Sequence, residues 1–158
     1  MLGGGIVVLG KKQYLVERLL LDFLKKNIII IMIKRPQYLE NGQALKGHDP
    51  IHVYNGTATL GNEGFSSLFD DALYHFESAE NKIIFDKNPG KYAPKYGGYC
   101  SIAVSEGVLV EANPHSALIQ DGDLHVFYKD DNEDTQDEWK ENPIVNKGKA
   151  ESEWAKLI

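Results

Sequence analysis

The side chains best suited to chemistry gather between Tyr92 and Cys100, where three tyrosines, a glycine pair and the chain's single cysteine fall within nine residues. Glycine lets a ligand or another backbone approach closely, and tyrosine combines an apolar ring with a polar tip. These residues predict either the lining of a ligand pocket or a packed turn, and the turn is the simpler interpretation. The residues concerned are Tyr92, Tyr96, Gly97, Gly98 and Tyr99.

Cys100 has three candidate roles. Its thiolate would ligate a metal ion or act as a nucleophile or redox group. Its thiol would instead be a small buried hydrophobe, which is the favoured interpretation because buried free cysteines commonly behave this way. A small enzyme that uses Cys100 and a nearby histidine stays an alternative, although the sequence contains no GxSxG, HExxH or phosphate-binding loop motif.

Five histidines supply the groups that titrate near neutral pH, namely His48, His52, His75, His115 and His125. His48 and His52 are four residues apart, but Asp49-Pro50 between them predicts a turn, in which that spacing does not bring two rings together. The acidic run from Asp130 to Asp134 imitates the start of a calcium loop. Thr135 occupies the position that requires glycine, so solvated negative charge at a helix start is the better interpretation.

Composition limits the class of protein. A chain of 158 residues suits one domain with its own core, and a net charge of −6 argues against nucleic acid as a partner. A single cysteine excludes an intramolecular disulfide and an all-cysteine zinc site. We expect a soluble protein, with the cytoplasm favoured as its compartment.

Residues 1–36 predict an N-terminal extension that differs from the rest of the chain. Leu15, Leu19 and Phe23 share one helical face, so the segment from Tyr14 to Leu24 predicts an amphipathic helix. It is either an accessory helix or poorly ordered extension, or a helix that docks on a membrane surface or a protein partner. The longest apolar run, Ile28 to Ile33, is far shorter than the roughly 20 residues of a transmembrane span.

Residues 37–158 predict one α+β domain with a small antiparallel sheet packed by a central helix and C-terminal helices. A turn is expected at Lys46–Pro50, and strands at Leu73–Phe76, Cys100–Val104 and Val108–Val110. Asp121-Gly122 predicts a hairpin between 117–120 and 124–128, because both residues suit the positive φ of its turn. Helices are expected at 79–86, capped by Ser78, at 136–141 and at 149–157, with Trp139 and Trp154 in the core. No internal repeat is apparent.

Four segments carry a resemblance to a known family. They are Lys46-Gly47-His48-Asp49-Pro50, Tyr74-His75-Phe76-Glu77-Ser78-Ala79-Glu80-Asn81, Asn88-Pro89-Gly90-Lys91-Tyr92-Ala93-Pro94 and Tyr96-Gly97-Gly98-Tyr99-Cys100. In this order they resemble the longer, single-domain branch of the YHS domain family, whose hairpin is similar to the one at Asp121-Gly122. The resemblance covers the chain from about residue 40 to the C-terminus.

The resemblance favours a non-enzymatic binding module. Because related domains accompany copper-transporting P-type ATPases, it implies a metal ion, with copper or another divalent ion as the first to test, and His52, Cys100, Glu77 and His48 as candidate ligands. Three cysteine positions of the ATPase-linked form are occupied by other residues here, at His52, Glu77 and Asn81. The alternative is a module that binds a small ligand or a protein partner, the latter through the N-terminal helix, and no metal.

Overall fold

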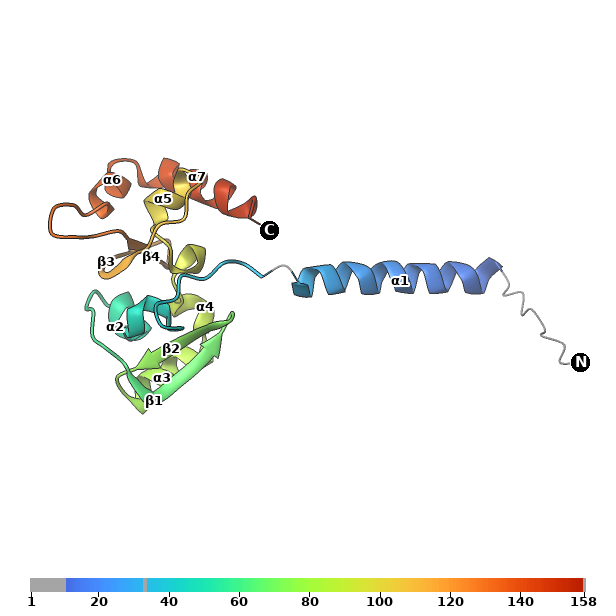
Figure 1. The fold of residues 1–158 in the computed structure, drawn as a ribbon, viewed down its shortest axis with the longest axis horizontal. Helices are drawn as coiled ribbons and strands as arrows, with labels where there is room; N and C mark the ends of the chain where they lie inside the picture. The colour runs from blue at the N-terminus through green and yellow to red at the C-terminus, as the bar shows by residue number, and fades with distance from the viewer. Residues whose placement is uncertain (1–10, 33, 158) are drawn as a thin grey trace, which may run out of the picture. The chain divides into compact units, whose positions relative to one another are not determined.

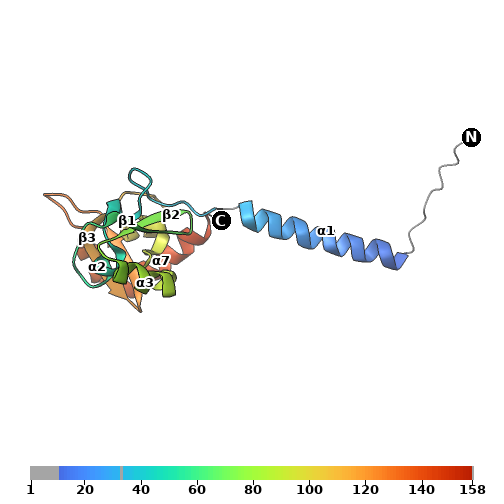
Figure 2. The same ribbon diagram turned by 90° about the horizontal axis from the view of Figure 1, so that it is seen from below.

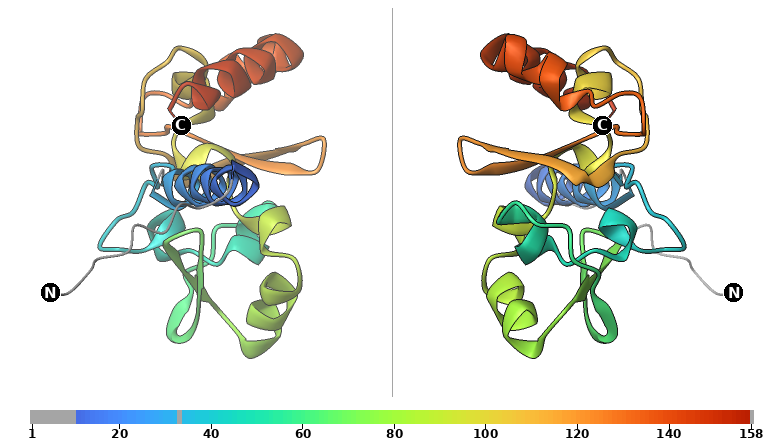
Figure 3. Two further views of the ribbon diagram at one scale, coloured as in Figure 1. Left: turned by 90° about the vertical axis from the view of Figure 1, so that its right-hand side faces the viewer. Right: turned by 90° about the vertical axis from the view of Figure 1, so that its left-hand side faces the viewer.

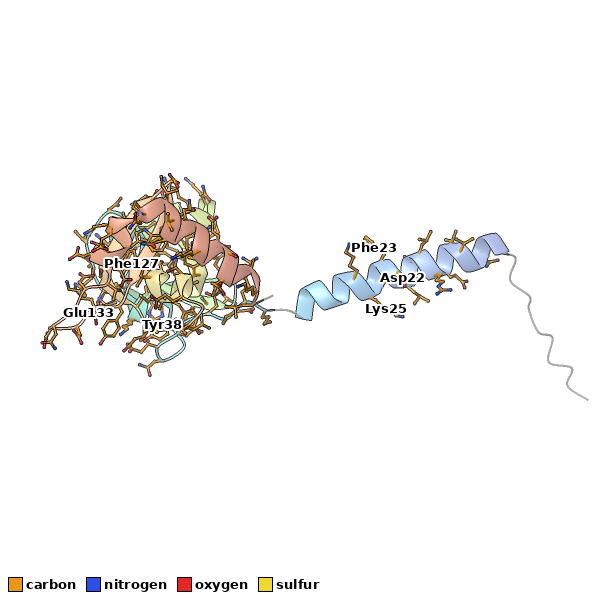
Figure 4. All side chains as sticks on the ribbon, turned by 90° about the horizontal axis from the view of Figure 1, so that it is seen from above. Asp22, Phe23, Lys25, Tyr38, Phe127 and Glu133 are labelled. Atoms are coloured by element: carbon orange, nitrogen blue, oxygen red, sulfur yellow. The ribbon has the colours of Figure 1, made fainter. Side chains whose placement is uncertain are left out.

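The computed structural model describes residues 11–32 and 34–157, which divide into two compact units, Met1–Lys34 and Arg35–Ile158. In the first unit, helix α1 (Lys11–Met32) contains the segment predicted to be helical (Figure 1). Apolar side chains between Leu15 and Leu24 are exposed, and Phe23 lies on this helix near Asp22 and Lys25 (Figure 4). No helix in the described part of the chain is long and apolar enough to cross a bilayer.

The second unit contains all the remaining elements (Figures 1 and 2). In chain order they are the 3₁₀ helix η1 (Ala44–Gly47), α2 (Pro50–Tyr54), β1 (Asn62–Phe69), β2 (Ala72–Phe76), α3 (Ala79–Lys87), α4 (Pro89–Tyr92), the 3₁₀ helix η2 (Lys95–Gly98), α5 (Ser101–Ser105), β3 (Asn113–Gln120), β4 (Asp123–Phe127), α6 (Gln136–Glu141) and α7 (Pro143–Ala155).

The predicted α+β class is confirmed, with the antiparallel strands arranged as two separate hairpins, β1-β2 and β3-β4. Figure 3 shows the two hairpins at different levels of the unit, with helices beside each. Phe85 of α3 packs on the first hairpin, its ring centroid 5.1 Å from that of Phe76. Trp139 of α6 packs on the second, 5.6 Å from Phe127. Helices therefore cover each hairpin with aromatic side chains.

Several predicted elements are confirmed. The Ser78 hydroxyl accepts a hydrogen bond from the backbone N–H of Asn81 and caps α3. Asp121 and Gly122 have φ values of 54° and 84° and join β3 to β4. Helix α6 occupies its predicted residues, and both Trp139 and Trp154 are buried. Local sequence rules succeed at these positions because a cap or a turn is decided by a few adjacent residues.

Other predictions are wrong. Residues 101–105 form helix α5, although Cys100–Val104 was expected to be a strand, and Val108–Val110 lies outside any strand. Helix α7 begins at Pro143, six residues before its predicted start at 149. A short apolar run suits a buried helix as well as a buried strand, so its surroundings decide. All five residues of α5 are buried.

The second unit contains an internal repeat, contrary to the expectation from sequence. Residues 45–76 form the first repeat and residues 96–127 the second, and matching positions are 51 residues apart: α2 and α5 begin at 50 and 101, β1 and β3 at 62 and 113, β2 and β4 at 72 and 123. Both hairpins also shift register at the same place, between Asn62 and Ser66 and between Asn113 and Ala117. In Figure 1 the first repeat lies below the second.

Backbone hydrogen bonds repeat with the elements. The N–H of Asp49 donates to the Thr59 carbonyl and that of Cys100 to the Val110 carbonyl, both at 2.9 Å. Non-glycine residues adopt left-handed backbone at equivalent positions, Leu45 (φ 52°) and Tyr96 (φ 55°). Eight of 32 aligned residues are identical, too few and too scattered to show as a sequence repeat. They are Gly47/Gly98, Ile51/Ile102, Val53/Val104, Gly56/Gly107, Asn62/Asn113, Asp70/Asp121, Leu73/Leu124 and Phe76/Phe127.

Candidate functional site

Two of the four predicted metal ligands meet. His52 lies on α2 and Glu77 follows β2, and His52 Nε2 contacts Glu77 Oε2. The other ring nitrogen of His52 lies 3.3 Å from Thr57 Oγ1. The pair is partly exposed, with relative side-chain accessibilities of 30% for His52 and 53% for Glu77. It is thus a surface contact between α2 and the residue that follows β2.

Asp49, which the sequence did not single out as a functional residue, brings this pair together. Its buried carboxylate accepts hydrogen bonds from the backbone N–H groups of Ile51 and Glu77 and from the side-chain amide of Asn81, each at 2.8 Å. It therefore ties the start of α2 to the end of β2 and to α3. Asp49 directly precedes Pro50, and an aspartate before a proline is typical of the start of a helix, so the sequence could have indicated this capping role.

Cys100 occupies the position in the second repeat that Asp49 occupies in the first. Its side chain is 1% exposed, and Sγ lies 3.3 Å from Thr135 Oγ1. Like Asp49, it precedes a five-residue helix and reaches toward a following segment. This placement matches the interpretation of Cys100 as a packed small side chain.

His48 lies elsewhere, half-buried, with its ring centroid 5.3 Å from that of His115. Within the described residues, no three His, Cys, Asp or Glu side chains form a group able to hold a metal ion. His52, Cys100, Glu77 and His48 therefore do not converge on one ion. The acidic run is engaged in a turn of its own, since Asp130 Oδ1 accepts from the N–H groups of Asn132 and Glu133.

The tyrosine cluster divides between packing and a cavity. Tyr92 packs against Tyr54 and Tyr99 against Tyr38, with ring centroids 5.1 and 5.7 Å apart. Tyr96 and Gly97 line a cavity of about 470 Å³, whereas Gly98 is buried in η2 without lining it. Gly97 also allows a close approach of backbones, because a Cβ there would lie 2.2 Å from the Pro36 carbonyl oxygen.

Three parts of the second unit form the cavity wall. The first repeat and the segment before it contribute Arg35, Gln37, Phe69, Asp70 and Tyr74. The segment from α4 to η2 contributes Gly90, Ala93, Pro94, Lys95, Tyr96 and Gly97. Helix α7 contributes Glu151, Trp154 and Ala155. The cavity thus lies between the repeats, and its size is typical of sites for small molecules.

A buried polar group at this wall lacks a partner. Tyr96 is 4% exposed, and its hydroxyl forms no hydrogen bond with any residue that the structure describes. Burial raises the pKa of the Tyr96 hydroxyl, and the negative charges of Glu151 and Asp123 raise it further. The hydroxyl is therefore neutral at neutral pH, and a buried donor without a partner costs free energy.

The charged groups of the wall carry both signs. Arg35 and Glu151 form no hydrogen bond or ion pair within residues 11–32 and 34–157. Asp70 accepts a hydrogen bond from the Gln37 side chain at 3.2 Å, and Lys95 lies 3.5 Å from Asp123. Burial raises the pKa of Tyr74, as does the charge of Asp70. The wall thus offers uncommitted positive and negative groups beside aromatic rings.

Comparisons with models of protein families, with curated proteins and with solved structures found no match to this chain.

Proposed function

We propose that residues 35–158 are a non-enzymatic binding module of the YHS type that holds a small ligand in the cavity beside Tyr96. The observation that carries the proposal is a cavity of about 470 Å³ whose wall combines aromatic side chains with charged groups of both signs. Cys100 and the five histidines are absent from the cavity lining, so the residues best suited to nucleophilic or general-base chemistry lie outside it. Binding is therefore better supported than catalysis.

The wall indicates the chemistry of the ligand. Tyr74, Tyr96 and Trp154 offer aromatic surface to an apolar or aromatic body. The guanidinium of Arg35 suits a carboxylate, and the carboxylate of Glu151 suits an ammonium group. A small molecule with an aromatic ring and charges of both signs satisfies all of these groups at once.

Three probes with one ring and different charges test the proposal: phenylalanine, 3-phenylpropionate and phenethylamine. We expect phenylalanine to bind most tightly, because it presents both the ammonium and the carboxylate. Binding would be followed by NMR, through the indole N–H of Trp154 and the backbone amides of Lys95 to Gly97. The change Glu151→Gln should abolish the preference for phenylalanine over 3-phenylpropionate, and Arg35→Gln the preference over phenethylamine.

Glu138→Gln is the matched control, because Glu138 lies on α6 and is absent from the cavity wall. It should leave all three affinities unchanged. Probes at millimolar concentration that shift no cavity resonance would contradict the proposal, as would equal effects of Glu138→Gln and Glu151→Gln.

Docking of α1 on a partner stays a prediction. Among the side chains of this helix that the structure describes, the exposed apolar ones are Leu15, Val16, Leu19, Leu20, Leu21, Phe23 and Leu24. The cavity with aromatic and charged walls belongs to the second unit, so we place ligand binding there.

A further inference from the structure

A second candidate site lies away from the cavity, where a histidine of the first repeat contacts a histidine of the second. His48 follows η1 in the first repeat and His115 lies on β3 in the second. Their ring centroids are 5.3 Å apart and the ring planes are inclined by 80°. The two residues are 67 positions apart in sequence, so the packing of η1 against β3 creates the pair.

A hydrogen bond fixes the tautomer of His48. Its Nδ1 lies 3.0 Å from the Leu45 carbonyl oxygen, which only accepts, so Nδ1 carries the proton and donates it. In the neutral ring Nε2 then bears a lone pair, and no residue in the described part of the chain forms a hydrogen bond with it. A histidine that donates one N–H to a backbone carbonyl and keeps the other nitrogen free has the arrangement found in metal ligands.

The electrostatic surroundings keep His48 available as a ligand. Burial lowers its pKa and the neighbouring His115 lowers it further, against the backbone groups of Leu45 and Lys46 and the charge of Glu40, which raise it. The ring is therefore neutral at pH 7, as metal binding requires. Lys46 is the adjacent cation, and its ammonium is paired with Glu111 at 3.0 Å.

The separation of the rings suits one shared ion. Bonds of about 2.0–2.1 Å from each ring nitrogen to a zinc ion place the two ring centres roughly 5 Å apart at a tetrahedral angle. His115 is exposed, so its ring is free to turn about its side-chain bonds and aim a nitrogen at the ion. Imidazole nitrogens select zinc, copper or nickel over magnesium or calcium.

The repeat shows that the fold does not need these two rings. The positions equivalent to His48 and His115 in the other repeat hold Tyr99 and Gly64. The same backbone thus forms with a tyrosine or with no side chain at these places. The histidine pair is an addition to the repeated framework.

We propose that His48 and His115 together bind one transition-metal ion of the zinc, copper or nickel class across the two repeats. The structure brings no third His, Cys, Asp or Glu of the described residues to this pair, so water completes the coordination. The site differs from His52 and Glu77 and from the cavity, and it holds whether or not the cavity binds a ligand.

Titration of the full chain, purified without a histidine tag and stripped of metal, with Zn²⁺ tests the proposal by calorimetry at pH 7.5. We expect one ion per chain with micromolar affinity, and NMR signals of the His48 and His115 rings that shift on binding. His115→Ala should weaken binding at least tenfold, and because His115 is exposed this variant should fold. His48→Gln should have the same effect.

His52→Ala is the control, because His52 is a partly exposed histidine that lies outside the pair and contacts the carboxylate of Glu77. It should bind Zn²⁺ as the unaltered chain does. Absence of saturable binding overturns the proposal, as does unchanged affinity in His115→Ala or a loss confined to His52→Ala.

Discussion

His125 shows how burial can be the largest influence on the charge of a residue. It is fully buried on β4, with its ring centroid 5.6 Å from that of Tyr96 and 4.9 Å from that of Trp139. Its Nδ1 lies 3.3 Å from Ser101 Oγ, while Nε2 has no hydrogen-bond partner among the described residues. Burial lowers the pKa of His125 to about 4, so the ring is neutral in the folded protein.

This burial predicts a specific loss of stability in acid. The unfolded chain binds a proton at His125 below its ordinary pKa of about 6.5, and the folded chain binds it only near pH 4. The free energy of unfolding should therefore fall by up to about 3 kcal/mol between pH 6.5 and 4 on account of this residue. His125→Phe keeps an aromatic ring and should remove that part of the fall. Urea unfolding of both proteins at pH 7, 5.5 and 4.5 measures it, and parallel pH curves would contradict the prediction.

At the scale of elements, η2 is held by a close backbone contact. The N–H of Tyr38 donates to the Gly97 carbonyl at 2.8 Å, and Gly97 has φ of 61°. A Cβ at Gly97 would meet the Pro36 carbonyl oxygen at 2.2 Å, whereas a Cβ at Gly90 would meet nothing within 4 Å. A larger side chain would therefore clash at Gly97 but would fit at Gly90.

We expect Gly97→Ala to lower the free energy of unfolding by about 2 kcal/mol or more, because it adds a clash and a left-handed alanine. Gly90→Ala, in α4, should change it by less than about 1 kcal/mol. Thermal and urea unfolding of the two variants measure the difference. Equal stabilities would show that the segment at Pro36 yields without cost.

At the scale of the whole second unit, the repeats depend on each other. Elements of the first repeat pack on elements of the second, α2 and η1 on β3. The chain's two tryptophans, Trp139 and Trp154, both lie beyond the first repeat and report on the packing of the second. If a substitution in the first repeat shifts the unfolding transition measured by tryptophan fluorescence, the two repeats unfold as one unit.

Asp49→Ala is suited to this measurement. It leaves the N–H groups of Ile51 and Glu77 and the amide of Asn81 without their acceptor, so we expect a loss of about 2 kcal/mol or more. The tryptophan fluorescence transition should move to lower urea together with the circular dichroism transition. Fluorescence that stays in place while circular dichroism becomes biphasic would mean that the repeats unfold separately.

The sequence by itself determined the features that a few adjacent residues decide. Asp121-Gly122 predicts its turn because both residues accept positive φ, and Ser78 predicts a helix start because its hydroxyl reaches the N–H three residues on. The buried positions of Trp139 and Trp154 follow from their size and apolar surface.

The tertiary structure alone decided the rest. The run after Cys100 became a helix because buried apolar residues suit either element and the surrounding packing chooses. The two repeats match in backbone structure, but only eight of 32 aligned residues are identical, so the sequence does not reveal them. His48 contacts His115 and His52 contacts Glu77 across 25 residues or more of sequence, and Arg35 and Glu151 line one cavity across a longer stretch. Such placements depend on how whole elements pack, so no local spacing rule predicts them.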